Sequence, residues 1–520
     1  LNHVADRLNT TFHPDSISRH IDSLKNLIIN ELSYHATRWN ANSDDMYANI
    51  LGMKEFGKNR GAIMRQHFEE YFNTGGSYPL TITSSHSNPG RIHVNTIDIT
   101  KFPWSGLYFN NNTITLTAIP APGYTFVTWQ GAVVSTNPTI TLTKNSATSV
   151  HAVFTYNAQN IPQIVISEIN YNSNSESDTG DWIELYNKSN TDQDVSGWTI
   201  TTQSPNKPFI FPQGSVIPAN SYCIVSSSLS KYNTMYPLAT YMRFGNIPFT
   251  LSKSQETLFL RNAQGYTIHS ISYNDTYPYP KKCDGYGYTL ECTDANNFVQ
   301  NPMIWRAPTY IGTPGKTNTP LIRNVNYNAI QINEVMYNPH DNAKCGDWIE
   351  LYNSGNSLVD ISGWVLRDGN NSISIIPKPT AIAAKSYIVF CENPQKFATV
   401  YPQVTCTPLN IGFKSSGDFI RLADQYELVV DSVQYSVFSD LGITTNGTGR
   451  TIIRDANNIW TYGNVGGTPE ANNIKGQTSL QEISHTTQYV YPNPCKSHIG
   501  ISIDDAYMIS IYTLLGQELM

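Results

Sequence analysis

Charged residues are scarce in this chain of 520 residues, where Lys, Arg, Asp and Glu together make up 14%. The acids outnumber the bases by 40 to 33, so the formal net charge is -7 at pH 7. Sequence-independent binding to nucleic acid needs a basic face, and we therefore expect no nucleic-acid partner. Long apolar runs are missing too: none approaches the roughly 18 residues of a membrane-spanning helix, so we expect no transmembrane segment.

The chain also lacks an initiator methionine and a signal peptide, since it opens on Leu1. At the other end, Met520 falls inside an apolar run. We expect both ends to be cut ends of a longer sequence, so the missing leader excludes no cellular compartment.

Cysteines are few and odd in number, at seven. Cys283 and Cys292 lie nine residues apart, and Cys391 and Cys406 lie fifteen apart, so each pair could close a short loop. Such disulfides would contribute about 3 kcal/mol each and would suit an exported protein. Free buried thiols remain the alternative, and this pairing leaves over Cys223, Cys345 and Cys495. No Cys-x-x-Cys or histidine cluster has zinc spacing, and we expect no metal or cofactor.

One octapeptide occurs twice, as Gly180-Asp-Trp-Ile-Glu-Leu-Tyr-Asn187 and as residues 346–353. Around it the likeness continues at an offset of 166 residues, and a Gly-Thr-Pro closes each copy, at residues 312–314 and 467–469. A period of roughly 150 residues is far longer than the 20 to 50 of a solenoid repeat. We therefore expect two whole domains, the first copy at residues 161–319 and the second copy at 327–473.

Alternation along the octapeptide predicts a strand with one aliphatic face and a second face on which aromatic rings flank a carboxylate. Asp181 and Glu184 are three residues apart and would point to opposite faces, so we expect no acid/base site from this pair. Calcium takes about six to eight oxygens, whereas the loop before Trp182 offers Glu176, Asp178 and Asp181 and the second copy only Asp341 and Asp347, so we expect no metal common to both copies. Gly315-Lys-Thr resembles the end of a phosphate loop, but position 310 holds tyrosine instead of the first glycine. We predict no catalytic residue here.

Each copy also contains Ile-x-Glu-(Ile/Val)-x-Tyr, at residues 166–171 and 332–337, and a Ser-Gly-Trp after the octapeptide. Together with the octapeptide and the closing Gly-Thr-Pro, these motifs resemble those of lamin-tail domains. The resemblance implies two immunoglobulin-like β-sandwiches. The residues that carry the motif, which we interpret as structural, are Trp182, Glu184, Trp198, Trp348, Glu350 and Trp364.

Residues 1–76 contain the helical part of the chain. Ile17, Ile21, Leu24, Ile28 and Leu32 recur on one helix face, and a second amphipathic pattern from Met46 is interrupted near Gly57. Two such helices do not bury a core alone.

The same segment contains the motifs Arg19-His-Ile-Asp22, Arg38-Trp39, Lys54-Glu-Phe56, Arg60 and Phe68. In these it resembles the C-terminal helical end of CotH-type proteins, which are atypical kinases. The catalytic motifs of that family lie upstream of the matching region, so no catalytic residue is carried over.

Residues 77–157 alternate between β-branched and polar residues, with turn signals between about five predicted strands. The segment contains the motifs Pro122-Gly-Tyr-Thr-Phe126, Trp129-Gln-Gly131 and Ala152-Val-Phe154. In these motifs it resembles the divergent internalin-B-type repeat of bacterial surface proteins. Trp104, Tyr108, Tyr124 and Trp129 could line a sugar platform. We favour a core role for Tyr124, Phe126 and Trp129, because aromatic residues dominate small β cores.

After a polar linker at residues 474–487, residues 488–520 predict a hairpin. Tyr491-Pro-Asn-Pro494 followed by Ile511-Tyr-Thr-Leu-Leu-Gly-Gln517 resembles the C-terminal sorting domain of type IX secretion substrates. Thr513 departs from the usual Asn or Asp, and the later strands of that domain are absent. The sorting signal would comprise Tyr491, Pro492, Asn493, Pro494 and Gly516.

We therefore predict a mainly β protein, with tandem immunoglobulin-like sandwiches, small β domains and an N-terminal α-helical segment. The resemblances imply the non-catalytic part of an extracellular or cell-surface protein, exported through the periplasm by the outer-membrane secretion machinery. Its β modules would act as spacers or would adhere to a protein ligand. Two alternatives stay open: the chain is part of a CotH-like kinase, or the lamin-tail pair binds surface glycan or cell wall.

Overall fold

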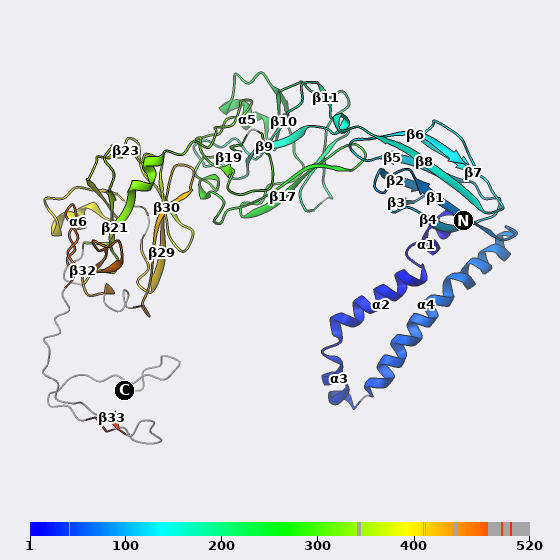
Figure 1. The fold of residues 1–520 in the computed structure, drawn as a ribbon, viewed down its shortest axis with the longest axis horizontal. Coiled ribbons are helices and arrows are strands. Elements are labelled where there is room, and N and C mark those ends of the chain that lie inside the picture. The colour runs from blue at the N-terminus through cyan, green and yellow to red at the C-terminus, as the bar shows by residue number, and fades with distance from the viewer. Residues whose placement is uncertain are drawn as a thin grey trace. The chain divides into compact units, whose positions relative to one another are not determined.

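The computed structural model describes residues 1–40, 42–204, 206–294, 296–340, 345–408, 410, 412–439, 445–476, 490–491 and 500–501. The chain divides into two compact units: Leu1–Arg323 with Gln425–Leu428, and Asn324–Asp424 with Val429–Met520. Helices are confined mainly to the first 72 residues, and strands make up most of the remainder (Figure 1).

The N-terminal segment contains four helices, α1 (Asn2–Asn9), α2 (Pro14–Ile28), α3 (Leu32–Trp39) and α4 (Ser43–Phe72). Asn42 caps α4 by accepting a hydrogen bond from Asp44 N at 3.0 Å, and Asn73 ends it in the left-handed conformation. The predicted interruption at Gly57 is wrong, because α4 continues through it. Gly57 is instead a contact point, where an added Cβ would lie 2.5 Å from Ile17 Cγ2 of α2.

Helix α1 packs on the β module that follows, a contact that the sequence did not indicate. Its Asp6 is fully buried and accepts hydrogen bonds from Tyr108 Oη at 2.9 Å, Thr96 N at 3.0 Å and Thr96 Oγ1 at 2.7 Å. The first helical turns therefore belong to the core of the β module.

That β module consists of two four-stranded sheets, in the orders β4-β1-β8-β6 and β3-β2-β5-β7. The strands number eight, where about five were predicted: β1 (Ser77–Ser84), β2 (Gly90–Val94), β3 (Ile97–Ile99), β4 (Trp104–Phe109), β5 (Ile114–Pro120), β6 (Tyr124–Gly131), β7 (Thr139–Leu142) and β8 (Thr148–Tyr156). Trp129 is fully buried in the core between the sheets, as expected. Tyr124 and Phe126 are half-buried at its margin.

The first copy forms a sandwich of a six-stranded sheet, β16-β15-β10-β9-β19-β20, and a four-stranded sheet, β13-β12-β17-β18. Ile166 and Ile183 of one sheet and Ile200 and Leu258 of the other share a single buried core. The elements are β9 (Ile164–Asn170), β10 (Trp182–Asn187), β11 (Gln193–Asp194), β12 (Thr199–Thr201), β13 (Phe209–Ile210), β14 (Val216–Ile217), β15 (Tyr222–Ser226), α5 (Leu229–Met235), β16 (Met242–Phe244), β17 (Gln255–Arg261), β18 (Thr267–Asn274), β19 (Leu290–Cys292) and β20 (Trp305–Arg306).

The second copy repeats this topology strand for strand, as β28-β27-β22-β21-β31-β32 over β25-β24-β29-β30. Both octapeptides lie in the second strand of their copy, β10 or β22. The elements are β21 (Ile330–Met336), β22 (Trp348–Asn353), β23 (Val359–Asp360), β24 (Val365–Arg367), β25 (Ile373–Ile375), β26 (Ala381–Ile382), β27 (Tyr387–Cys391), α6 (Pro394–Val400), β28 (Cys406–Pro408), β29 (Gly417–Ala423), β30 (Val429–Ser436), β31 (Arg450–Arg454) and β32 (Trp460–Val465).

Short 3-10 turns η1 (Ala158–Asn160), η2 (Lys281–Cys283) and η3 (Val325–Ala329) complete the described helical elements. Near the C-terminus β33 (Val490–Tyr491) pairs antiparallel with β34 (Gly500–Ile501). Among the helices of the described residues, none is both long and apolar enough to cross a bilayer.

Candidate functional site

The octapeptide strand is buried on both faces in each copy, so its polar side chains point into the protein. Asp181 Oδ2 accepts a hydrogen bond from Leu251 N at 2.9 Å, and Asp347 Oδ2 accepts the equivalent bond from Phe413 N at 2.8 Å. Asn187 and Asn353 are fully buried and donate to backbone carbonyls of their own copies. These polar groups hold loops against the sheet.

The octapeptide tryptophans lie in matching surroundings. Trp182 stands edge-on to Tyr232, with ring centroids 5.8 Å apart, and Trp348 stands edge-on to Phe397 at 6.0 Å. Both partners come from the short helix that follows the seventh strand of the copy, α5 after β15 or α6 after β27. Trp198 and Trp364 are buried in the cores between the sheets. All four tryptophans are therefore buried.

The central carboxyl of each octapeptide holds the closing Gly-Thr-Pro segment. In the first copy, Glu184 is fully buried and accepts from Gly315 N at 2.6 Å and from Ser167 Oγ at 2.7 Å. Its neighbour Glu168 on β9 accepts from Thr313 N at 3.1 Å and from Thr289 Oγ1 at 2.5 Å. The chain beyond β20 is thus fastened to the sheet by two carboxyls.

The second copy builds the same clamp at equivalent positions. Glu350 accepts from Glu470 N at 2.5 Å and from Asn333 Nδ2 at 2.7 Å. Glu334 on β21 accepts from Thr468 N at 3.0 Å and from Thr451 Oγ1 at 2.5 Å. An added Cβ on Gly467 would lie 2.7 Å from Glu334 Oε1, and Gly467 has a positive φ of 68°, so the closing motif requires glycine there.

Burial makes these carboxyls weak acids, since their described partners are amides and hydroxyls and not cations. Loss of hydration raises the pKa of Glu350 to about 8 and that of Glu334 to about 7, despite the hydrogen bonds that each accepts. In the first copy burial raises the pKa values of Glu168 and Glu184, and the carboxyl of Glu291 raises both further. Perturbed acids of this kind often mark active sites, so their access to substrate decides their role.

The surroundings of these acids favour a structural role. Their oxygens face backbone amides and hydroxyls of the same domain, and Glu168, Glu184, Glu334 and Glu350 have no exposed surface. Within the described part of the chain, no group of three His, Cys, Asp or Glu side chains is arranged to hold a metal ion. A reaction would need a reacting atom within about 3 Å of such a group, which the closing segment occupies instead.

Sequence reasoning identified Glu184 and Glu350 as motif residues and missed what they bind. It noted Glu168 and Glu334 only as members of the Ile-x-Glu motif, and it assigned no role to Glu291. The sequence did contain an indication of their burial. In both Ile-x-Glu motifs, which are 166 residues apart, a glutamate stands among apolar strand residues. Buried acids are rare enough for that repetition to indicate burial with partners.

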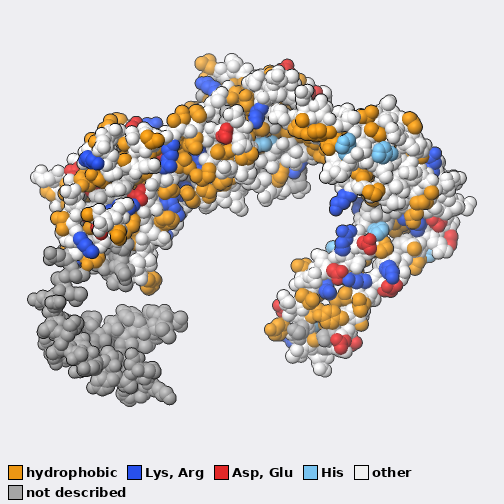
Figure 2. Space-filling model, viewed as in Figure 1, with side chains coloured by type: hydrophobic (Ala, Val, Ile, Leu, Met, Phe, Trp, Pro, Cys, Tyr) orange, Lys and Arg blue, Asp and Glu red, His pale blue; other side chains and the backbone are white. Residues whose placement is uncertain are grey.

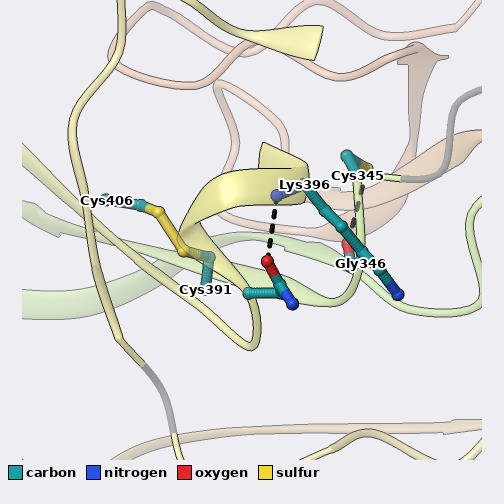
Figure 3. Close-up of a disulfide and its surroundings, with 6 residues drawn as sticks. Cys345, Gly346, Cys391, Lys396 and Cys406 are labelled. Carbon is teal, nitrogen blue, oxygen red and sulfur yellow. Dashed lines mark hydrogen bonds between the residues drawn. A yellow bond between two sulfur atoms is a disulfide. The ribbon is translucent and has the colours of Figure 1, made fainter. Parts of the chain in front are cut away.

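The cysteines follow the predicted pairing in one copy only. Cys391 and Cys406 form a disulfide that joins β27 to β28 across α6, and Cys345 lies near it as a free thiol (Figure 3). Cys283 and Cys292 remain free, so their predicted bond is corrected. Both are buried in the core of the first copy, and Cys292 Sγ is turned to the carbonyl of Asp294 at 3.6 Å.

A separate cavity lies on the helical segment. It measures about 950 Å³ and opens between α1, α2 and α4. Its lining is mainly apolar and includes Ile17, Ile21, Met53, Phe56 and Phe68. Hydrophobic side chains also reach the surface along the helices, interspersed with charged ones (Figure 2).

Most of the predicted sorting signal lies outside the described residues. Tyr491 lies in β33. Pro492, Asn493, Pro494 and Gly516 lie outside the described residues, as does Cys495.

Comparison with known proteins agrees with two of the resemblances. Residues 157–275 and 324–436 match the family model of the Lamin Tail Domain, and residues 94–158 match that of the Divergent InlB B-repeat domain. The two copies are therefore lamin-tail domains of immunoglobulin-like fold. No curated protein matches the chain.

Two solved structures resemble parts of the chain weakly. A DUF4876 family protein from Bacteroides thetaiotaomicron VPI-5482 is 10% identical, covers 48% of this chain and 97% of its own length, and has a TM-score of 0.20. The tetra-tandem repeat in the extending region of a large adhesion protein is 8% identical, covers 69% of this chain and 74% of its own, and has a TM-score of 0.11. At such TM-scores neither informs the fold.

Proposed function

We propose that this chain is the non-catalytic part of an exported cell-surface protein, in which the β modules act as spacers or adhesive units. One observation carries the proposal: both lamin-tail domains use their buried acids to hold their own closing segment. The side chains that could have done chemistry are thus committed to the fold. The B-repeat and lamin-tail modules suit display outside the cell, because each buries its own core and can be joined in series.

Export is tested in cells that carry the complete gene. Surface digestion with proteinase K should remove lamin-tail epitopes from intact cells, and deletion of residues 491–494 should keep those epitopes inside. A cytoplasmic marker that stays intact in the same digestion controls for lysis. Epitopes that resist digestion in intact wild-type cells would contradict export, and equal digestion after the deletion would contradict the sorting role of the Tyr-Pro-Asn-Pro word.

A second candidate function is that of a CotH-like kinase to which residues 1–76 contribute helices. The apolar cavity between α1, α2 and α4 supports it, since an uncovered groove of about 950 Å³ suits packing against further protein. Met53 and Phe56 line that groove and are 52% and 65% exposed. Incubation of the complete gene product with radiolabelled ATP tests this candidate: label transfer to protein would support a kinase, and none would favour the non-catalytic proposal.

A third candidate is glycan binding by the lamin-tail pair. A stacked tyrosine pair repeats on both copies: Tyr186 and Tyr222 have centroids 4.7 Å apart, and Tyr352 and Tyr387 are 4.6 Å apart. All four rings are half-buried, and sugar rings commonly pack on such aromatic surfaces. Residues 157–476 on a polysaccharide array should bind, and Tyr186→Ser with Tyr352→Ser should lose binding. If the array shows no binding, the remaining candidate roles of the lamin-tail pair are spacing and contacts with other proteins.

A further inference from the structure

One hydroxyl in the first copy lies between two buried acids. Thr313 Oγ1 is 3.3 Å from Glu168 Oε2 and 3.0 Å from Glu291 Oε2. A threonine hydroxyl carries one hydrogen and can donate to one acceptor only. The second carboxyl therefore makes a hydrogen bond to Thr313 only if it brings a proton of its own.

Glu291 has a second feature that points to a proton. Its Oε1 is buried and has no hydrogen-bond partner among the described residues, while Oε2 accepts from Thr319 N at 3.1 Å. A charged oxygen left unpartnered in the interior is far more costly than the carbonyl oxygen of a neutral carboxyl. The geometry thus favours a proton held by the Glu168–Glu291 pair.

Among the described residues, acids, phenols (Tyr241 among them) and a thiol face this cluster. Glu184 on β10 is a third acid, Tyr222 on β15 and Tyr236 after α5 are neutral phenols, and Cys283 of η2 is a buried thiol. Arg306 lies opposite Glu291 in the ladder, but its guanidinium donates to the carbonyls of Pro278, Pro302 and Met303. Lys282 lies over the ring of Tyr288.

The three acids together hold one stretch of chain, residues 313–319, called the clasp below. Thr313 N donates to Glu168, Gly315 N donates to Glu184 and Thr319 N donates to Glu291. If all three acids were ionised, three negative charges would face one another in the interior. Opening the clasp would let water reach them and would relieve that repulsion.

The second copy provides a natural comparison, because it lacks the third acid. Glu168 pairs with Glu291 in the ladder of the first copy, and Glu334 pairs with Ile453 at the same place in the second. Thr468 Oγ1 there lies 3.3 Å from Glu334 Oε2, and its other acceptor among the described residues is the amide oxygen of Asn473. The proton-sharing arrangement therefore belongs to the first copy.

We propose that Glu168, Thr313 and Glu291 share a proton and that this proton closes the clasp, so that the first copy releases its closing segment in alkali more steeply than the second. The closed clasp holds one proton more than its counterpart in the second copy. Each proton bound only in the closed form makes the closed-to-open ratio fall about tenfold per pH unit. A rise in pH therefore opens the clasp of the first copy.

Hydrogen–deuterium exchange of the whole chain tests the proposal at pH 6, 7, 8 and 9, with each rate divided by the intrinsic rate at that pH. Protection of residues 313–319 should fall more steeply with pH than protection of residues 468–473. Glu291→Ile introduces the isoleucine that the second copy has at this place, Ile453. In this variant the fall in protection per pH unit should be smaller by a factor of about ten. Ile453→Glu should steepen the slope of the second copy.

The slope separates this mechanism from a merely structural role, which would change protection by the same factor at every pH. Glu291→Gln serves as a second variant in case isoleucine disturbs packing, because it keeps the shape and cannot ionise. Equal slopes in the two wild-type copies, or an unchanged slope in a folded Glu291→Gln variant, would overturn the proposal.

Discussion

At the scale of single residues, a buried carboxyl such as Glu350 links stability to pH. Burial raises its pKa from an ordinary 4.5 to about 8 in the folded domain. Between these values the folded domain binds more protons than the unfolded chain, so the free energy of unfolding falls as pH rises through this window. We predict that Glu350→Gln flattens part of that fall. Urea denaturation followed by tryptophan fluorescence at pH 5, 7 and 9 measures it.

Glu350→Ala is the matched control for this prediction. It leaves Glu470 N and the amide of Asn333 without their acceptor, which costs about 1–3 kcal/mol for each orphaned group at every pH. Alanine should therefore lower stability throughout, whereas glutamine should change mainly the slope. A glutamine variant with the wild-type slope would show that this carboxyl does not titrate in the window.

At the scale of elements, the contact between α2 and α4 depends on a glycine. An added Cβ on Gly57 would lie 2.5 Å from Ile17 Cγ2, and the β-branched Ile17 side chain has little freedom to move away. We predict that Gly57→Ala destabilises the helical segment by about 1–3 kcal/mol, in spite of the better helix propensity of alanine. Thermal unfolding followed by circular dichroism at 222 nm measures the change.

Gly52 provides the control on the same helix. Nothing lies within 4 Å of the Cβ that alanine would add there, so Gly52→Ala should stabilise α4 by about 1 kcal/mol. If both alanines stabilised the segment equally, α2 and α4 would not pack as described.

The disulfide between β27 and β28 is an element of the second copy alone. The strand pairing places Ser226 and Arg243 of the first copy where Cys391 and Cys406 stand in the second. A loop of this length contributes about 3 kcal/mol by restricting the unfolded chain. We predict that reduction raises hydrogen exchange in residues 392–408 and leaves residues 229–244 unchanged. Equal responses in both segments would contradict this assignment.

At the scale of the whole molecule, each lamin-tail domain buries its own core, so the two should unfold independently. Trp182 is fully buried beside Tyr232, and its truncation to alanine should cost about 3–5 kcal/mol. We predict that Trp182→Ala lowers the midpoint temperature of the calorimetric transition of the first copy. The midpoint temperature of the second copy should stay unchanged. Trp348→Ala should move the other transition. A common shift of both would mean one cooperative unit.

The sequence was informative where a pattern repeats. The two octapeptides predicted matching strands and matching tryptophan environments, because burial on a strand constrains residue type at each position. It was less informative about α4, where Gly57 was interpreted as a break although the helix runs through it. The sequence does not distinguish a glycine that breaks a helix from one that allows a neighbouring helix to approach closely.

The sequence by itself determined the mainly β fold, the duplication and the negative net charge, because these follow from composition and periodicity. Only the tertiary structure decided which cysteines pair and what the acids do. Glu168, Glu184 and Glu291 are far from Thr313 in sequence and meet it through the packing of β9, β10 and β19. Whether a carboxyl is a reactive group or a clamp depends on its burial and partners, and those arise when distant strands assemble.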